Sequence, residues 1–249
     1  DAPAARPGFC ARCAARIPWH PTASCPTCAR PTGRREGATR SCGRCLWRAP
    51  AQASTTACAV LHFDEAEDPL RHSIHELKYR GELGIARVLG RALAVAAHRR
   101  GLAADVVAPV PLHLDRLRWR GFNQALLLAR HLGLGKTPVA ARALVRTRPT
   151  RPQVELDGTA RRANVAGAFR VADAASIAGK RIALVDDVMT TGATVDACSR
   201  ALLRAGAGRV AGVVAARAGR DWGDPGWGAA SDMRRLRPPA STSPSALGE

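Results

Sequence analysis

The chain has 249 residues, of which 46% are hydrophobic, enough for one sizeable core plus a small appended module. No apolar run reaches the length of a membrane span and the polar, proline-rich start lacks the apolar segment of a signal peptide, so we expect no membrane insertion and a cytoplasmic location. The net charge is +18 with only three lysines, and this arginine excess indicates either a polyanionic partner or the codon bias of a GC-rich genome.

Residues 1–50 are rich in cysteine, proline and arginine and show almost no apolar periodicity, so they need a metal to fold. Six cysteines form three Cys-x-x-Cys pairs: Cys10/Cys13, Cys25/Cys28 and Cys42/Cys45. The spacing of the last two pairs predicts a zinc ribbon in which Zn²⁺ has a structural role, instead of disulfides. Cys10/Cys13 either replaces one of these pairs or belongs to a second site.

Beyond residue 58 the pattern alternates between apolar strands and amphipathic helices. Strands are predicted at 59–64, 106–111, 142–146, 169–171, 182–185 and 210–216, and helices at 69–79, 84–99, 122–132 and 195–205. Alternating βα units predict an α/β domain over residues 58–221, with a mostly parallel sheet and helices on both faces. Residues 222–249 are rich in Pro, Ser, Gly and Ala, which predicts a disordered tail.

A basic stretch follows the second predicted strand. Arg116, Arg118 and Arg120 occupy alternate positions and are followed by Gly121. If this stretch is extended, all three guanidinium groups project to one side, where their planar forks suit a pyrophosphate. The alternative is a solvated basic turn.

Two further polar features precede the most informative motif. Gln153, Arg162 and Asn164 are predicted in a long polar loop between two strands, which is either an active-site lid or a flexible crossover. Lys78 is predicted at the end of a helix, where an ammonium group complements the helix dipole.

Residues 182–194 are the most informative stretch. The predicted strand 182–185 leads into two adjacent carboxylates, Asp186 and Asp187, and then into a loop before a helix. That loop consists of Thr190, Thr191, Gly192, Ala193 and Thr194. Free amides and the dipole at a helix start favour an anion, and paired carboxylates suit a sugar diol or a metal bound to pyrophosphate. The order predicts a site for a phosphorylated ribose; the alternative is an ordinary turn with a threonine cap.

This stretch resembles the signature of type I phosphoribosyltransferases, which bind 5-phosphoribosyl-1-pyrophosphate (PRPP). Further motifs extend the resemblance to the ComF (ComFC/GntX) family: the Cys-x-x-Cys pairs, Glu-Leu-Lys-Tyr-Arg-Gly at 76–81, Arg-Gly-Phe-Asn-Gln-Ala at 120–125, and Arg-x-Asn-Val-x-Gly-x-Phe at 162–169. The resemblance implies a type I phosphoribosyltransferase-like fold with an N-terminal zinc ribbon. It also implies that the acidic pair holds the ribose hydroxyls, that the loop holds the 5-phosphate, and that Mg²⁺ accompanies PRPP.

The ComF resemblance implies a role in DNA uptake and natural transformation, with single-stranded DNA and other competence proteins as partners. Two alternatives stay open: a catalytically active phosphoribosyltransferase of nucleotide metabolism, and a non-catalytic PRPP-sensing regulator. Thr190 stands where purine-type relatives often carry an aspartate that serves the base. The catalytic residues and the acceptor are therefore not identified by the sequence.

Overall fold

The computed structural model describes residues 25–29, 45, 56–63, 69–150 and 158–218. Five of the predicted site residues are not fully described. Cys10, Cys13, Cys42 and Gln153 lie outside the described residues, as does the predicted tail, and of Arg162 only the backbone is described. The predicted limits of the N-terminal module and of the tail stay predictions.

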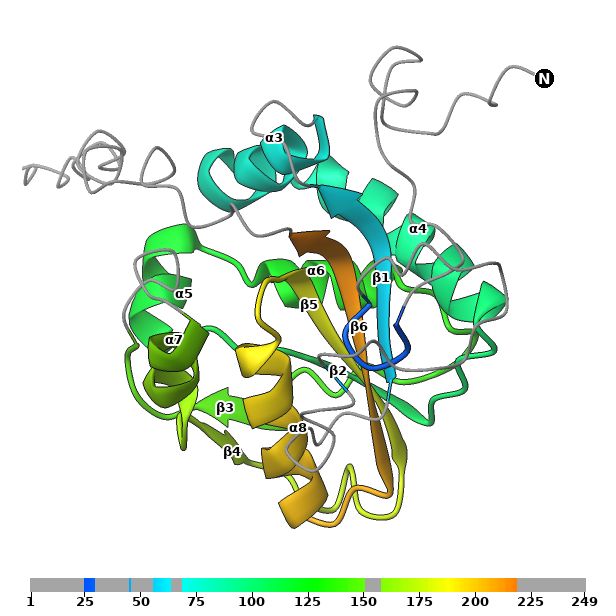
Figure 1. Cartoon of the computed structure of the whole chain (residues 1–249), viewed down its shortest axis with the longest axis vertical. Coiled ribbons are helices and arrows are strands. Elements are labelled where there is room, and N and C mark those ends of the chain that lie inside the picture. The colour runs from blue at the N-terminus through cyan, green and yellow to red at the C-terminus, as the bar shows by residue number, and fades with distance from the viewer. Residues whose placement is uncertain (1–24, 30–44, 46–55, 64–68, 151–157, 219–249) are drawn as a thin grey trace, which may run out of the picture.

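A four-stranded parallel sheet forms the centre of the fold (Figure 1). Its strands follow the order β1 (Thr56–Phe63), β6 (Arg209–Ala218), β5 (Arg181–Met189) and β2 (Val106–Pro109). Every neighbouring pair is parallel, which confirms the predicted sheet. Parallel strands have their carboxyl ends at one edge of the sheet, where α/β proteins bind ligands.

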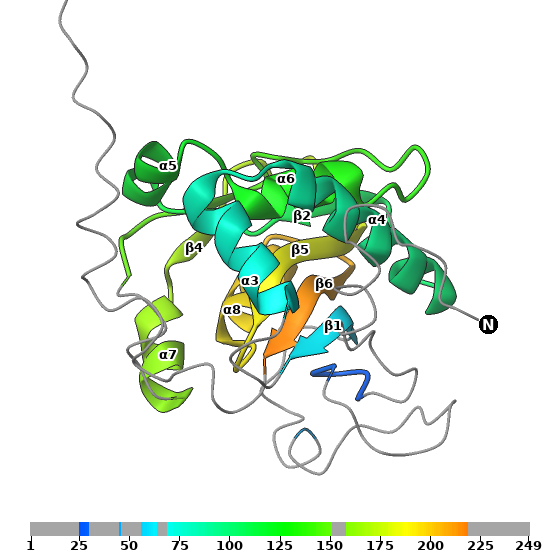
Figure 2. The same cartoon turned by 90° about the horizontal axis from the view of Figure 1, so that it is seen from above.

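Helices cover both faces of this sheet, as predicted (Figure 2). One face packs against α3 (Pro69–His75), η2 (Glu76–Arg80), α4 (Gly84–Arg99) and α6 (Gln124–His131). The other packs against α8 (Ala193–Arg204). Side chains of a strand alternate between faces: Ile182 and Leu184 join the α8 side of the core, whereas Ala183 and Val185 join the α4 side.

Several predicted boundaries and one predicted loop are wrong. The predicted helix 69–79 is α3 followed by one turn of wider π-helix, η2, which ends at Gly81 with φ 73°. Strand β5 runs through both aspartates to Met189, although the sequence predicted its end at residue 185. The predicted polar loop through residue 162 contains α7 (Gly158–Val165). Packing of α7 against α8 gives these polar residues a helical conformation that their weak apolar pattern did not predict.

Two predicted strands lie outside the parallel sheet. β3 (Leu144–Arg146) and β4 (Phe169–Val171) pair with each other in an antiparallel arrangement. Leu144 and Phe169 pack with α8 in the same core cluster. The small sheet therefore lies beside α8 (Figure 1).

The packing of α4 against α6 depends on a glycine. A Cβ at Gly90 would lie 2.4 Å from His131 Cβ and 3.0 Å from the Leu128 carbonyl oxygen, which is closer than side chains approach in folded proteins.

Within the described residues, no helix combines the length and apolarity that crossing a lipid bilayer requires.

Candidate anion-binding site

Asp186 and Asp187 are buried near the carboxyl end of β5, only 8% and 4% exposed. Neighbouring strand residues alternate between the two faces of the sheet. Asp187 therefore lies on the same face as Ala183 and Val185, and Asp186 lies on the α8 face. Asp186 Oδ1 accepts a hydrogen bond from the Asp187 amide at 2.9 Å, and Asp187 Oδ1 accepts one from the Val188 amide at 2.9 Å. These bonds orient both carboxylates at the end of the strand.

Lys78 is the nearest cation to this pair that the structure describes. Its ammonium Nζ lies 2.5 Å from Asp187 Oδ2, and only 15% of its side chain is exposed. Sequence reasoning assigned Lys78 to the helix dipole and missed this contact, because nothing in the local pattern reveals an approach across more than a hundred residues. The sequence signal that includes Lys78 is the Glu-Leu-Lys-Tyr-Arg-Gly motif at 76–81, one of the motifs that carry the family resemblance.

The two carboxyls differ in their pKa. Burial, followed by the adjacent charge of Asp187, raises the pKa of Asp186 well above its ordinary value. Burial alone would also raise the pKa of Asp187, but the Lys78 ammonium, with smaller contributions from Asp186 and Arg120, lowers it overall. The site therefore holds one ionised carboxylate in an ion pair and one carboxyl that ionises less readily.

The predicted extended arginine stretch is a helix, α5 (Leu114–Arg120), so the expectation that three guanidinium groups share one side is wrong. On a helix, residues four apart share a face and a residue midway between them points away. Arg116 and Arg120 are accordingly half-buried, whereas the Arg118 side chain is 78% exposed and lies 3.9 Å from Asp115 Oδ1. Gly121 ends α5 in the left-handed conformation, with φ 81°.

Arg120 packs against Gln124 and Tyr79 and interacts with the charge of Asp187. Its Nη1 donates a 2.6 Å hydrogen bond to Gln124 Oε1, and its guanidinium lies 5.5 Å from the centre of the Tyr79 ring. Burial lowers the pKa of Arg120 while the charge of Asp187 opposes that shift. Its Nε is buried and has no hydrogen-bond partner among the described residues, so a donor is left for an anion.

The start of α6 is fixed to the strand that precedes α5. Asn123 Oδ1 caps the helix by accepting from the Ala125 amide at 2.9 Å, and its Nδ2 donates to the Val110 carbonyl at 3.0 Å. This bridge closes the 110–123 segment. It thereby fixes the position of Arg120 relative to the sheet.

The threonine loop, residues 190–194, joins β5 to α8 as the sequence predicted. Gly192 has φ 82° and precedes the first helical residue, Ala193. A side chain is rarely tolerated at such a φ, so the glycine is required for this turn. Thr191 Oγ1 accepts a 3.3 Å hydrogen bond from the Ala193 amide. The loop thus leads into the amide-rich first turn of a twelve-residue helix.

Arg146 is a second cation that sequence reasoning missed. It lies at the end of β3, 5.4 Å from the centre of the Phe169 ring, and its Nη2 donates to Thr150 Oγ1. Burial, followed by the nearby positive charge of Arg116, lowers its pKa, whereas Cys198 and Asp186 oppose the shift. Cys198 is fully buried on α8, and burial raises the pKa of its thiol.

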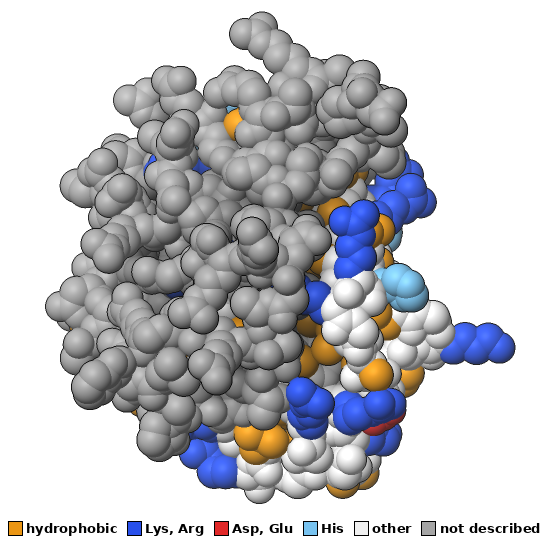
Figure 3. Space-filling view, turned by 45° about the vertical axis from the view of Figure 1, so that its right-hand side comes forward, with side chains coloured by type: hydrophobic (Ala, Val, Ile, Leu, Met, Phe, Trp, Pro, Cys, Tyr) orange, Lys and Arg blue, Asp and Glu red, His pale blue; other side chains and the backbone are white. Residues whose placement is uncertain are grey.

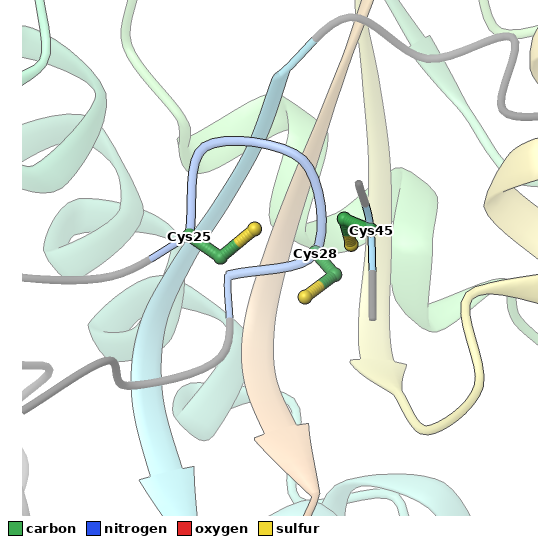
Figure 4. Close-up of side chains that lie close together, drawn as sticks. All are labelled: Cys25, Cys28 and Cys45. Carbon is green, nitrogen blue, oxygen red and sulfur yellow. The ribbon is translucent and has the colours of Figure 1, made fainter. Parts of the chain in front are cut away.

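A cluster of three cysteines (Figure 4) lies on the α8 face of the sheet, because Ala29, next to Cys28, packs into the core cluster on that face. The sulfur atoms of Cys25, Cys28 and Cys45 all lie within 4.8 Å of one another, and none forms a disulfide. Tetrahedral ligation at a Zn–S distance of about 2.3 Å places sulfurs roughly 3.8 Å apart, so three thiolates at this spacing fit such an ion. Cys42, the predicted fourth ligand, lies outside the described residues.

The residues of the predicted lid are only partly placed. Asn164 is half-buried on α7, and Arg162 belongs to the same helix. Their predicted placement in a loop is therefore wrong, and a lid role stays a prediction for Gln153, Arg162 and Asn164.

Comparison with known proteins identifies a family and several relatives. Residues 120–227 match the family described as phosphoribosyl transferase domain. The DNA utilization protein YhgH of Escherichia coli (strain K12) is 34% identical over 212 residues, covering 82% of this chain and 87% of that protein. Competence protein F of Haemophilus influenzae is 31% identical over 210 residues, covering 81% of this chain and 87% of that protein.

One solved structure is also similar in part. Glutamine phosphoribosylpyrophosphate (PRPP) amidotransferase from B. subtilis is 24% identical, with a TM-score of 0.34, and the match covers 52% of this chain and 25% of that enzyme.

Proposed function

The chain belongs to the ComF family of phosphoribosyltransferase-like proteins, and from this we propose that it binds PRPP with Mg²⁺ at the carboxyl end of β5. The observation that carries the proposal is the arrangement of a buried acidic pair, a glycine-containing threonine loop and the start of α8 in one continuous segment.

Each part of PRPP has a matching group in this segment. We assign the 5-phosphate to the threonine loop, where Thr190, Thr191 and Thr194 supply hydroxyls and the first turn of α8 supplies amides. The ribose hydroxyls are assigned to Asp186 and Asp187. Negative charge on the phosphates is also favoured by the positive end of the α8 dipole.

The pyrophosphate is assigned to Arg116 and Arg120, which share the inner face of α5. The unpartnered Nε of Arg120 supports this assignment. Arg118 stays a predicted contact, and its exposed position does not favour that role. Mg²⁺, held through Asp186 and Asp187, would neutralise charge on the pyrophosphate.

The Lys78–Asp187 ion pair supports the same assignment. Lys78 places a positive charge where the proposed metal and hydroxyls bind, which keeps Asp187 ionised before the ligand arrives. A carboxylate that is already ionised binds a divalent cation without first releasing a proton.

The proposal is tested by titration calorimetry with PRPP and Mg²⁺. Asp186→Asn and Asp187→Asn should each weaken PRPP binding at least about tenfold, because each removes a charge-assisted contact. Asp105→Asn is the matched control, because Asp105 is exposed and pairs with Arg181 at the opposite end of β5. Binding that survives in both site variants would overturn the assignment.

Catalytic transfer is an alternative outcome for the same site. Transfer breaks the bond between ribose C1 and pyrophosphate, which leaves with the electron pair, and forms a bond from C1 to an acceptor that loses a proton. Thr190 does not provide the general base that an aspartate would supply there. Pyrophosphate release from PRPP, measured with a panel of nucleobase and amine acceptors, distinguishes transfer from binding alone.

We propose Zn²⁺ as the metal of the cysteine cluster, with Cys42 completing the tetrahedron. Three thiolate donors select a soft metal over Mg²⁺. Metal analysis of the purified protein should find one Zn²⁺ per chain, and Cys28→Ser should remove it.

A role in DNA handling is the second part of the proposal, supported by the names of the curated relatives and by one surface. Trp119 is 40% exposed on α5 beside the exposed Arg118, and its ring meets Tyr79 edge-on at 6.1 Å. An exposed aromatic ring next to a guanidinium group suits stacking with a nucleic acid base. On a different face of the molecule from Trp119, Figure 3 shows more Lys and Arg than acidic side chains among the described residues.

Single-stranded DNA binding tests this role. Affinity should fall as salt rises, because phosphate contacts release counterions. Trp119→Ala should weaken binding at least about fivefold through the loss of stacking, whereas Leu83→Ala, an exposed apolar residue beyond the end of η2, should not. Equal affinity in all three proteins would overturn the assignment of this surface.

A further inference from the structure

Arg217 joins the cysteine cluster to the threonine loop through one guanidinium group. It lies at the end of β6 and is only 7% exposed. Its Nε donates to the Cys28 carbonyl at 3.0 Å, while its Nη1 donates to the carbonyls of Met189, at 2.8 Å, and of Thr190. Arg217 thus connects the segments around Cys28 and Thr190, which lie far apart in the sequence.

The contacts to residues 189 and 190 set the direction of the threonine loop. A peptide unit is planar and trans, so its C=O and the N–H of the next residue point in opposite directions. When Arg217 holds the Thr190 carbonyl, the amide of Thr191 is turned away from Arg217. Arg217 therefore fixes the orientation of amides that the proposed 5-phosphate needs, without touching the ligand.

The contact to Cys28 extends this arrangement to the metal site. Cys28 is one of the three clustered thiols, and the Cys25 carbonyl accepts from the Ala29 amide at 2.8 Å in the same tight turn. Short segments of this kind depend on the metal for their conformation. A metal ion bound to the thiolates would therefore fix the Cys28 carbonyl. That carbonyl accepts from Arg217 Nε, so it holds one side of the rigid, planar guanidinium group.

We propose that Arg217 is a positioning residue that couples occupancy of the cysteine metal site to binding at the threonine loop. With the metal present, Arg217 is held by the backbone carbonyls of Cys28, Met189 and Thr190, together with that of its neighbour Ala218. Without it, the Cys28 contact is lost and the loop carbonyls are held less firmly. This inference rests on the proposed PRPP site and adds a regulation of that site. The coupling is reciprocal, so PRPP also strengthens zinc binding.

The test is a double cycle of metal removal and substitution. PRPP affinity is measured with Mg²⁺ in excess for the zinc-loaded full chain and for the same chain after chelation and dialysis. Wild-type protein should lose affinity on the order of 5- to 150-fold, the usual range for coupling between sites. Arg217→Gln should show the weakened affinity already when zinc-loaded, with no further loss on metal removal.

Arg204→Gln is the matched control, because Arg204 is exposed in the last turn of α8, and it should retain the wild-type coupling. Arg217→Lys keeps the charge without the fork and should lose the coupling, which decides the matter if Arg217→Gln does not fold. A readout independent of PRPP affinity is the equilibrium competition for Zn²⁺ between the protein and a chromophoric chelator. PRPP should raise the zinc affinity of wild-type protein and leave that of Arg217→Lys unchanged.

Three results would overturn the inference or its premise. Unchanged PRPP affinity after zinc removal from wild-type protein rules out the coupling. An equal loss on metal removal in wild-type and Arg217 variants rules out Arg217 as its carrier. If zinc-loaded wild-type protein binds no PRPP at all, the proposed function itself fails.

Discussion

The ammonium of Lys78 and the carboxylate of Asp187 lie 2.5 Å apart in a largely buried ion pair. The pair connects η2, which packs on one face of the sheet, to the carboxyl end of β5. It supplies the positive charge that keeps a buried carboxylate ionised where the proposed ligand binds.

Lys78→Met should destabilise the fold by about 3 kcal/mol, because removing one partner leaves a buried charge without compensation. Asp187 then loses the largest contribution that lowers its pKa, so its pKa rises and the folded state favours the protonated carboxyl more than in the wild type. The loss of stability should therefore be larger at pH 8 than at pH 5 in urea unfolding. Lys136→Met, at an exposed lysine, should change stability by less than about 0.5 kcal/mol. A loss independent of pH would contradict the buried-pair account.

Arg120→Gln and Arg118→Gln should separate the two faces of α5. Arg120→Gln should weaken PRPP binding at least about tenfold, because it removes a charged donor from the pyrophosphate side. Arg118→Gln should leave PRPP binding within about twofold but weaken single-stranded DNA binding and reduce its salt dependence. Calorimetry and DNA titrations on both variants check this. The opposite pattern would contradict this division of α5 into two functional faces.

Gly90→Ala should destabilise the protein by about 1–3 kcal/mol, since the added methyl overlaps the Cβ of His131 and forces α4 and α6 apart. Gly84→Ala is the matched control. It lies at the start of the same helix with open space around its Cβ, and it should stabilise by up to about 1 kcal/mol. Urea midpoints of both variants measure the difference. Equal effects would contradict close helix packing at residue 90.

Asp105 should contribute to the acid dependence of stability. Hydrogen bonds from Arg181 lower the pKa of Asp105 from 3.8 to about 2. A carboxyl with a depressed pKa stabilises the fold above its unfolded pKa and loses that contribution as pH falls through its folded value. Asp105→Asn should therefore remove part of the acid slope between pH 3.8 and about 2. The pair is exposed, so the difference should shrink in about 1 M salt; an unchanged slope would contradict the assignment.

The sequence predicted the parallel sheet and the threonine loop because both are local patterns. The apolar run before Asp186 and the glycine at 192 carry their own conformational signals. The helical form of α5 was missed, because Arg116, Arg118 and Arg120 supply no apolar periodicity and Leu114 and Leu117 are exposed.

The contacts that complete the site were beyond sequence reasoning for a different reason. Lys78, Arg146 and Arg217 come from segments far from residue 186, and their positions depend on how helices and strands pack. Lys78 reaches Asp187 because the wider turn of η2 continues α3 over the sheet. Arg217 reaches the threonine loop because β6 lies beside β5 in parallel register, with Met189 opposite Arg217.

Hydrogen exchange of the threonine-loop amides is the most direct test of PRPP binding at this loop. Exchange is followed at residues 190–195 in the zinc-loaded protein with Mg²⁺, before and after PRPP is added. We expect slower exchange at these amides, because phosphate oxygens accept their hydrogen bonds, and no slowing in Asp186→Asn at the same PRPP concentration. PRPP binding with unchanged exchange at residues 190–195 would show that the phosphate is held elsewhere.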